Sequence, residues 1–172
     1  TLDEGLFQGL YDLTTLYLSS NELVSVGANL FQSLHNMKEL YLQRNQLVTL
    51  EVELFRDLQK LVYLNLQSNN LTTLDELLFQ DLQFLLILSL QDNQITTMDV
   101  GLFQDLQNLS MLFLKGNQLK TLDVGIFNYM NNVETLHLEF KHISILETHT
   151  FRDLKSLQTI TLNDNNLKHV DI

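Results

Sequence analysis

The sequence predicts an α/β solenoid of stacked turns, with a parallel β-sheet on one face and short helices or turns on the opposite face. Two observations carry this prediction. Aliphatic residues recur with a period of 24 along the whole chain, and such regularity indicates identical stacked units. Within each period the pattern L-x-L alternates every two residues, which is typical of a half-buried strand rather than a helix.

The central position of each predicted strand is aliphatic in all seven units. These residues are Leu16, Leu40, Leu64, Leu88, Leu112, Leu136 and Ile160. In a strand the two leucines of L-x-L point to one side and the residue between them to the other. The leucines of neighbouring units are therefore expected to stack into one continuous apolar core.

Two further columns share the spacing of 24. The phenylalanines, expected to fill the core from the convex side, are Phe7, Phe31, Phe55, Phe79, Phe103, Phe127 and Phe151. The asparagines that follow the strands are Asn21, Asn45, Asn69, Asn93, Asn117 and Asn165, with Lys141 as the exception. An asparagine amide can pair with backbone groups that a turn would otherwise leave unpaired.

Composition excludes several functional classes. The 172 residues carry a formal net charge of −11, which argues against nucleic acid or anionic membrane as a partner. There is no cysteine, so disulfides and thiol nucleophiles are impossible.

No cofactor-binding or catalytic motif occurs, and we expect neither an enzyme nor a bound cofactor. His137, Glu139 and His142 lie close in sequence, but no further ligand converges on them, so we predict no metal site.

Each unit reads L-x-x-L-x-L-x-x-N-x-L, as in residues 13–23, LTTLYLSSNEL, and the related stretch 34–42, LHNMKELYL. This pattern resembles the leucine-rich repeats of animal extracellular proteins, in particular variable lymphocyte receptors and Toll-like receptor ectodomains, with an invertebrate relative favoured. The resemblance covers essentially all of the chain. It implies a horseshoe with the sheet on its concave face, an extracellular setting, and recognition of antigens by that face.

Two features depart from the family pattern. Aspartate occupies the usual proline position in three units, at Asp75, Asp99 and Asp123, and the chain has no proline. The cysteine-rich caps of the family are also missing.

We predict a single domain over residues 1–172, with about seven repeats and no terminal caps. Either the segment belongs to a longer protein, or a partner or second copy covers its ends. Membrane contact would need an anchor outside this chain.

The outward-facing strand positions vary between units while the scaffold positions hardly change. Aromatic and apolar residues dominate the middle of this face, and exposed patches of that kind usually mark interaction sites. The predicted ligand-binding residues are Tyr17, Tyr41, Val62, Tyr63, Leu86, Ile87, Met111, Phe113, His137 and Phe140. The predicted polar rim consists of Lys38, Glu39, Arg44, Asp92, Lys115, Glu134 and Glu139. The alternative is that neighbouring side chains only pack against one another.

The sixth unit is irregular, since lysine replaces the asparagine at Lys141 and a large apolar residue, Phe140, precedes it. The irregularity either presents a binding feature or is a tolerated departure from the repeat pattern near one end of the array. Two N-x-S/T sequons predict glycosylation at Asn70 and Asn108.

These observations favour a non-catalytic module that binds a protein or glycan on its concave face. The alternative is a structural or adhesion module that self-associates, with a homodimer as one form.

Overall fold

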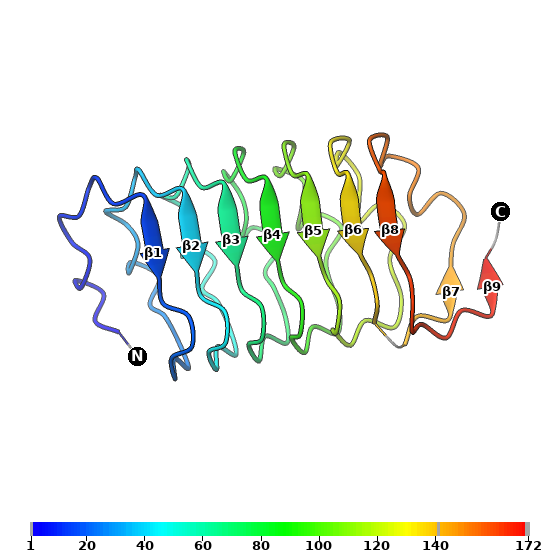
Figure 1. The fold of residues 1–172 in the computed structure, drawn as a ribbon, viewed down its shortest axis with the longest axis horizontal. Coiled ribbons are helices and arrows are strands. Elements are labelled where there is room, and N and C mark those ends of the chain that lie inside the picture. Colours follow the sequence, from blue (N-terminus) through cyan, green and yellow to red (C-terminus); the bar gives the residue numbers. More distant parts are fainter. Residues whose placement is uncertain (1, 141, 171–172) are drawn as a thin grey trace.

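The structure, a computed structural model, describes residues 2–140 and 142–170. Seven short strands lie side by side in one parallel sheet, joined by long connections that return behind it (Figure 1). They are β1 (Thr15–Tyr17), β2 (Glu39–Tyr41), β3 (Tyr63–Asn65), β4 (Ile87–Ser89), β5 (Met111–Phe113), β6 (Thr135–His137) and β8 (Thr159–Thr161). The predicted parallel-strand solenoid is confirmed.

The register of the sheet follows the 24-residue period. Leu16 pairs with Leu40, Leu40 with Leu64, and the same offset continues to the pairing of Leu136 with Ile160. The central leucines of β2 to β6 are fully buried, because each lies between two neighbouring turns that carry leucine or isoleucine at the same position. A second, two-stranded parallel sheet of β7 (Ile145–Leu146) and β9 (His169–Val170) lies at the C-terminal end (Figure 1).

The phenylalanine column fills the core opposite the sheet. Five of its members are at most 1% exposed: Phe31, Phe55, Phe79, Phe103 and Phe127. Neighbouring rings lie nearly parallel, with centroids 6.3 Å apart for Phe55 and Phe79 and 6.5 Å apart for Phe79 and Phe103. These rings belong to one continuous hydrophobic core that extends through successive turns.

Of the two forms predicted for the convex side, short helices or turns, the described residues contain turns and no helix. In the connection between β2 and β3, the N–H groups of Leu54, Arg56 and Leu58 donate to carbonyls three residues earlier. These bonds involve every second residue, whereas a helix needs them at consecutive residues. The convex side is consequently a series of separate β-turns.

The predicted role of the asparagines is confirmed, and each one after Asn21 also joins two turns of the solenoid. The Nδ2 of Asn93 donates to Leu90 O in its own turn and to Leu66 O in the preceding turn, both at 3.0 Å. Its Oδ1 accepts from the N–H of Leu71 at 3.1 Å. Asn45 and Asn69 repeat this arrangement. Lys141, which interrupts the column, lies outside the described residues.

Candidate binding face

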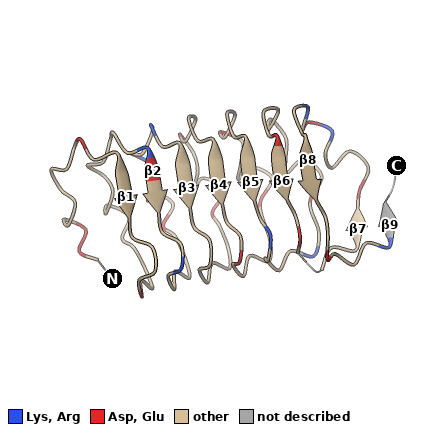
Figure 2. Ribbon diagram, in the orientation of Figure 1, with Lys and Arg blue, Asp and Glu red and all other residues tan. Residues whose placement is uncertain are grey.

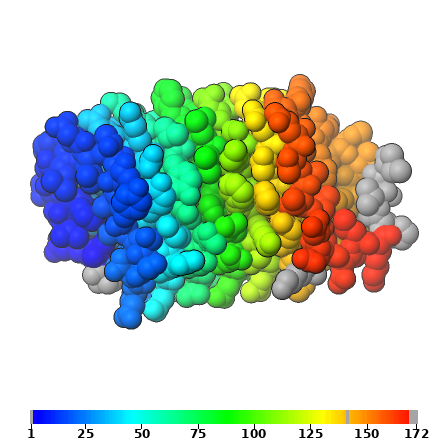
Figure 3. All heavy atoms as spheres, in the orientation of Figure 1, coloured from blue at the N-terminus to red at the C-terminus, as the bar shows by residue number. Residues whose placement is uncertain are grey.

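The outward side chains of the seven-stranded sheet form a broad surface, termed the sheet face, which corresponds to the predicted concave face. Successive turns cross this surface as adjacent stripes (Figure 3). Most of the strand ribbons carry neither acidic nor basic residues, and the charges gather at strand ends and in loops (Figure 2). Glu39 on β2 is a charged exception within a strand.

The register brings the predicted binding columns together. One column runs Tyr17, Tyr41, Asn65, Ser89, Phe113, His137 and Thr161, and the other runs Thr15, Glu39, Tyr63, Ile87, Met111, Thr135 and Thr159. Beside them Leu86 is exposed and Val62 is half-buried. The structure thus places nine of the ten predicted ligand-binding residues, all except Phe140, on or beside the sheet face.

Two groups of packed rings lie on this face, with Tyr17 and Tyr41 stacked and the other ring pairs tilted by 32–36°. The ring centroids of Tyr17 and Tyr41 are 4.4 Å apart, and those of Tyr41 and Tyr63 are 4.9 Å apart. Farther along, the rings of Phe113 and His137 lie 5.0 Å apart. Tyr17 nevertheless stays 66% exposed, so the self-packing considered from the sequence occurs but leaves aromatic surface open to solvent.

A hollow of about 280 Å³ separates the two aromatic groups, and we call it the central hollow. Its lining residues are Tyr63, Asn65, Gln67, Ile87, Ser89, Gln91, Met111 and Phe113. Small side chains form its base, because Asn65 and Ser89 occupy the positions that carry tyrosine on β2 and phenylalanine on β5. The column of large residues therefore contains a gap at β3 and β4.

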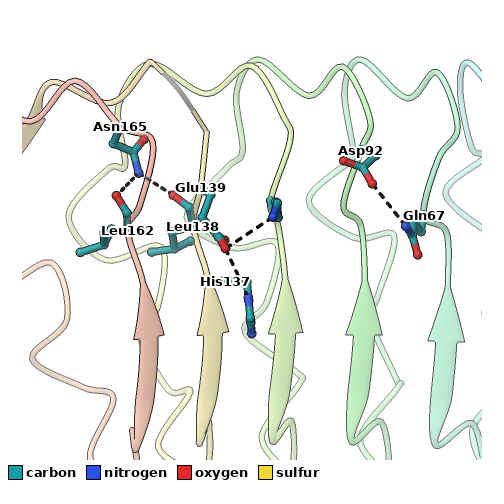
Figure 4. Close-up of polar contacts among 8 residues, drawn as sticks. Gln67, Asp92, His137, Leu138, Glu139, Leu162 and Asn165 are labelled. Carbon is teal, nitrogen blue, oxygen red and sulfur yellow. Dashed lines mark hydrogen bonds and ion pairs between the residues drawn. The ribbon is translucent and has the colours of Figure 1, made fainter.

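The rim of the sheet face is held by hydrogen bonds. The Tyr41 hydroxyl donates to Glu39 Oε2 at 3.0 Å. Loss of hydration and this bond to a carboxylate both raise the pKa of Tyr41, so its phenol is neutral. Gln67 Nε2 donates to Asp92 Oδ2 at 3.2 Å (Figure 4). Lys38, Arg44 and Glu134 are exposed, as predicted for rim residues.

Glu139 departs from its predicted place on the rim, since it is only 8% exposed. Figure 4 shows its carboxylate facing His137, and Oε1 lies 3.6 Å from His137 Nδ1. The same oxygen lies 4.0 Å from Lys115 Nζ, a longer contact than a good ion pair. Glu139 thus contacts the base of the Phe113–His137 stack.

The prediction that Phe140 is an exposed binding residue is wrong, since it is 1% exposed and belongs to the core. The cause is the backbone. In the other six units this position has a φ between 54° and 72°, as in Arg44, Asp92 and Gly116. A bulky residue rarely adopts that conformation, and Phe140 does not. Its turn takes another course, and the side chain is buried.

The predicted glycosylation sites lie on different parts of the surface. Asn70 is half-buried, and its Oδ1 accepts from Gln94 Nε2 at 3.2 Å. Asn108 is exposed, and its Nδ2 donates to Gln83 O at 2.8 Å. Asn36 and Asn132 make the same bond to the carbonyl 25 residues earlier. This second asparagine column was not predicted, although its members are separated by multiples of 24 residues in the sequence.

Over residues 2–140 and 142–170, no group of three or more His, Asp or Glu side chains is arranged to hold a metal ion. Within the same ranges, no helix is long and apolar enough to cross a membrane.

Comparisons with known proteins agree with this architecture. The model of the leucine-rich-repeat family matches residues 1–47, 35–95, 59–119, 84–143 and 114–167. No curated protein matches the chain. Among solved structures, a complex of TLR13 with ssRNA13 matches with 27% identity and a TM-score of 0.74, over 96% of this chain and 27% of the other.

The Toll–Spatzle complex, described as a molecular hub in Drosophila development and innate immunity, matches with 23% identity and a TM-score of 0.79. That alignment covers 98% of this chain and 25% of the other, and it shows the shared fold. The chain spans about a quarter of the length of both matched chains. The predicted resemblance to Toll-like receptor ectodomains is confirmed, and the chain belongs to the leucine-rich-repeat family.

Proposed function

We propose that this chain is a non-catalytic recognition module that binds a protein or glycan ligand on its sheet face, as the concave face of an immune-type receptor does. One observation carries the proposal. Positions that build the core carry leucine or another aliphatic residue in every unit, whereas the outward positions beside them vary and include several aromatic residues. A surface needed only for solubility would be polar throughout.

The character of the exposed residues supports binding. Tyrosine and phenylalanine are frequent anchors at interfaces, because they bury a large area at a low cost in side-chain entropy. Charged groups such as Lys38, Arg44 and Asp92 surround the aromatic centre, as in interfaces that have an apolar core and a polar rim. The likeness to receptor ectodomains of the Toll type supports an extracellular or endosomal setting.

Simultaneous replacement of Tyr63, Ile87 and Phe113 by alanine is expected to abolish binding. Loss of a central anchor costs about 2 kcal/mol or more, so the three substitutions together should lower affinity by about 10⁴-fold. The measurement is binding of wild type and variant to an array of extracellular proteins and glycans. Unchanged circular dichroism would show that the fold is intact.

The matched control is the replacement of Leu77, Val100 and Val124 by alanine, since all three are exposed in the convex turns. This variant should bind as wild type does. Capture that survives the first triple substitution, or is lost only with the control, would reject the sheet face as the binding surface.

A self-associating module is the second candidate, and the 66% exposure of Tyr17 favours it, because two such faces could bury their aromatic residues together. Light scattering at micromolar concentration separates the two candidates. A dimer that the triple substitution dissociates would identify a second copy of the chain as the ligand.

The expectation that nucleic acid is excluded receives no support from the structural likeness, since one matched structure contains ssRNA. The net charge of −11 remains the argument against such a partner. For this reason we favour a protein or glycan ligand.

A further inference from the structure

Phe84 is an exposed aromatic residue at the edge of the sheet where the strands begin. Its side chain is 61% exposed, and it lies shortly before β4. The same position carries Lys60 in the preceding unit and Asn108 in the following one. A single exposed apolar residue is ordinary in a folded protein, so the significance of Phe84 depends on what lies next to it.

Asn108, one of the two predicted glycosylation sites, is hydrogen-bonded to the backbone beside Phe84. Its Nδ2 donates to Gln83 O at 2.8 Å, and this carbonyl belongs to the peptide bond between Gln83 and Phe84. The atom that would carry a glycan therefore lies beside Phe84. An amide nitrogen has two hydrogens, and glycosylation replaces only one of them. The bond to Gln83 is thus compatible with glycosylation and would hold the first sugar at this place.

The pairing of a sequon with an aromatic residue is specific to Asn108. Asn132 makes the equivalent bond to the preceding unit at 2.8 Å, but the residue at its position in that unit is Asn108 itself. Asn70, in the other sequon, has glutamine at its position in both adjacent units. A glycan on Asn108 is therefore the one that would start next to a ring.

The chemistry of a sugar suits this neighbour. A pyranose ring has C–H groups on its flat faces and hydroxyl groups around its edge. The C–H face packs against an aromatic ring through dispersion, while the hydroxyl groups remain in water. Adjacent units of the sheet lie about 4.8 Å apart, which is within the usual distance of about 4.5–7 Å between packed rings.

A hollow of about 390 Å³ continues this surface on the side of Phe84 away from Asn108, and we call it the edge hollow. Its lining residues are His35, Asp57, Gln59, Lys60 and Phe84. In other units an asparagine donates to the carbonyl 25 residues earlier. Here Lys60 donates to Asn36 Oδ1 at 2.7 Å instead, and Phe84 has no donor. Within the described residues the carbonyls of His35 and Gln59 therefore receive no such bond, and sugar hydroxyl groups are suitable donors to them.

We propose that the glycan on Asn108 folds back over this edge of the solenoid. Its first N-acetylglucosamine packs on the Phe84 ring, and the next sugar enters the edge hollow. Attachment joins C1 of the first sugar to Nδ2, while a proton leaves Nδ2 and a lipid pyrophosphate leaves the activated oligosaccharide donor. The inference rests on the extracellular or endosomal setting of the proposed function. The glycan becomes a fixed cover of one edge and leaves the sheet face open.

The test compares protein secreted by a eukaryotic host with unglycosylated protein from bacteria. Peptide mass spectrometry should show an occupied Asn108, and an endoglycosidase that leaves one N-acetylglucosamine simplifies the sample. We expect nuclear Overhauser effects between the ring protons of Phe84 and that sugar. In urea titrations the single sugar should raise the folding equilibrium constant by about fivefold, the size expected for one favourable ring contact.

Phe84→Ala should remove this gain but leave the unglycosylated protein unaffected, because the side chain is exposed. Ser110→Ala deletes the sequon, keeps Asn108, and should behave as the unglycosylated protein does. The matched control combines Ser110→Ala with Glu134→Thr, which moves the sequon to Asn132. That asparagine has the equivalent hydrogen bond but no ring beside it, so its sugar should raise the folding equilibrium constant by less than about twofold.

Any of four results would overturn the inference: an unoccupied Asn108, missing Overhauser effects, a gain that survives Phe84→Ala, or an equal gain from the sugar on Asn132. The array experiment separates this failure from failure of the proposed function. If Ser110→Ala captures array ligands that the triple alanine variant loses, the sheet face binds them whether or not the glycan contacts Phe84.

Discussion

Replacement of Phe79 by alanine is expected to lower the free energy of unfolding by about 3–5 kcal/mol, the usual cost of removing a buried phenylalanine ring. Phe79 is 1% exposed and stacks on Phe55 and Phe103 in the adjacent turns. The cavity would therefore weaken three turns together. Urea denaturation followed by circular dichroism measures the effect.

Phe84→Ala is the matched control, because it deletes the same ring from a side chain that is 61% exposed. Its effect should stay within about 0.5 kcal/mol, as for most surface substitutions. Equal effects of the two substitutions would show that the phenylalanine column does not form the core.

Asn93→Ala is the second substitution with a large expected effect, a loss of about 3 kcal/mol. It leaves the buried N–H of Leu71 without its acceptor, and an unpaired buried donor costs about 1–3 kcal/mol. Two further bonds are lost, to Leu66 O and Leu90 O. Those carbonyls still accept from Asn69 and Asn117, which limits the damage.

Urea denaturation also measures this effect, with Asn108→Ala as the control. Asn108 is exposed and makes a single bond to a carbonyl of the preceding turn, so its loss should cost less than about 1 kcal/mol. A cost for Asn93→Ala as small as that of the control would mean that the asparagine column does not hold the turns together.

Most of the scaffold could be predicted from the sequence, because repetition fixes both period and register. The spacing of Leu40, Leu64 and Leu88 at 24 residues corresponds to their pairing in the sheet. Burial of the phenylalanines and pairing of the asparagines follow from side-chain chemistry repeated in every unit. These features need no knowledge of the connecting segments.

The convex side could not be predicted in the same detail. Its residues are compatible with both a short helix and a series of turns, and the choice depends on how each turn packs on its neighbours. Phe140 shows a similar limit. The 24-residue repeat predicted an exposed position for Phe140. The residues at this position in the other units adopt a positive φ that phenylalanine avoids, so the turn at Phe140 differs from the others.

The binding columns were predicted correctly as columns, but the central hollow was not. It arises because the rings of Tyr63 and Phe113 pack against Tyr41 and His137, on the strands farther from β4. A sequence lists these residues without showing in which direction each ring leans. The small residues Asn65 and Ser89 were visible as breaks in an aromatic column, and this was the available signal.

The most direct test of recognition by the sheet face is hydrogen–deuterium exchange of the chain with and without a ligand captured from the array. We predict added protection in residues 62–67, 86–91 and 110–115, which include β3, β4 and β5. The convex turns at residues 75–82 and 99–106 should exchange unchanged. Protection confined to those turns, with the three strands unaffected, would contradict the account.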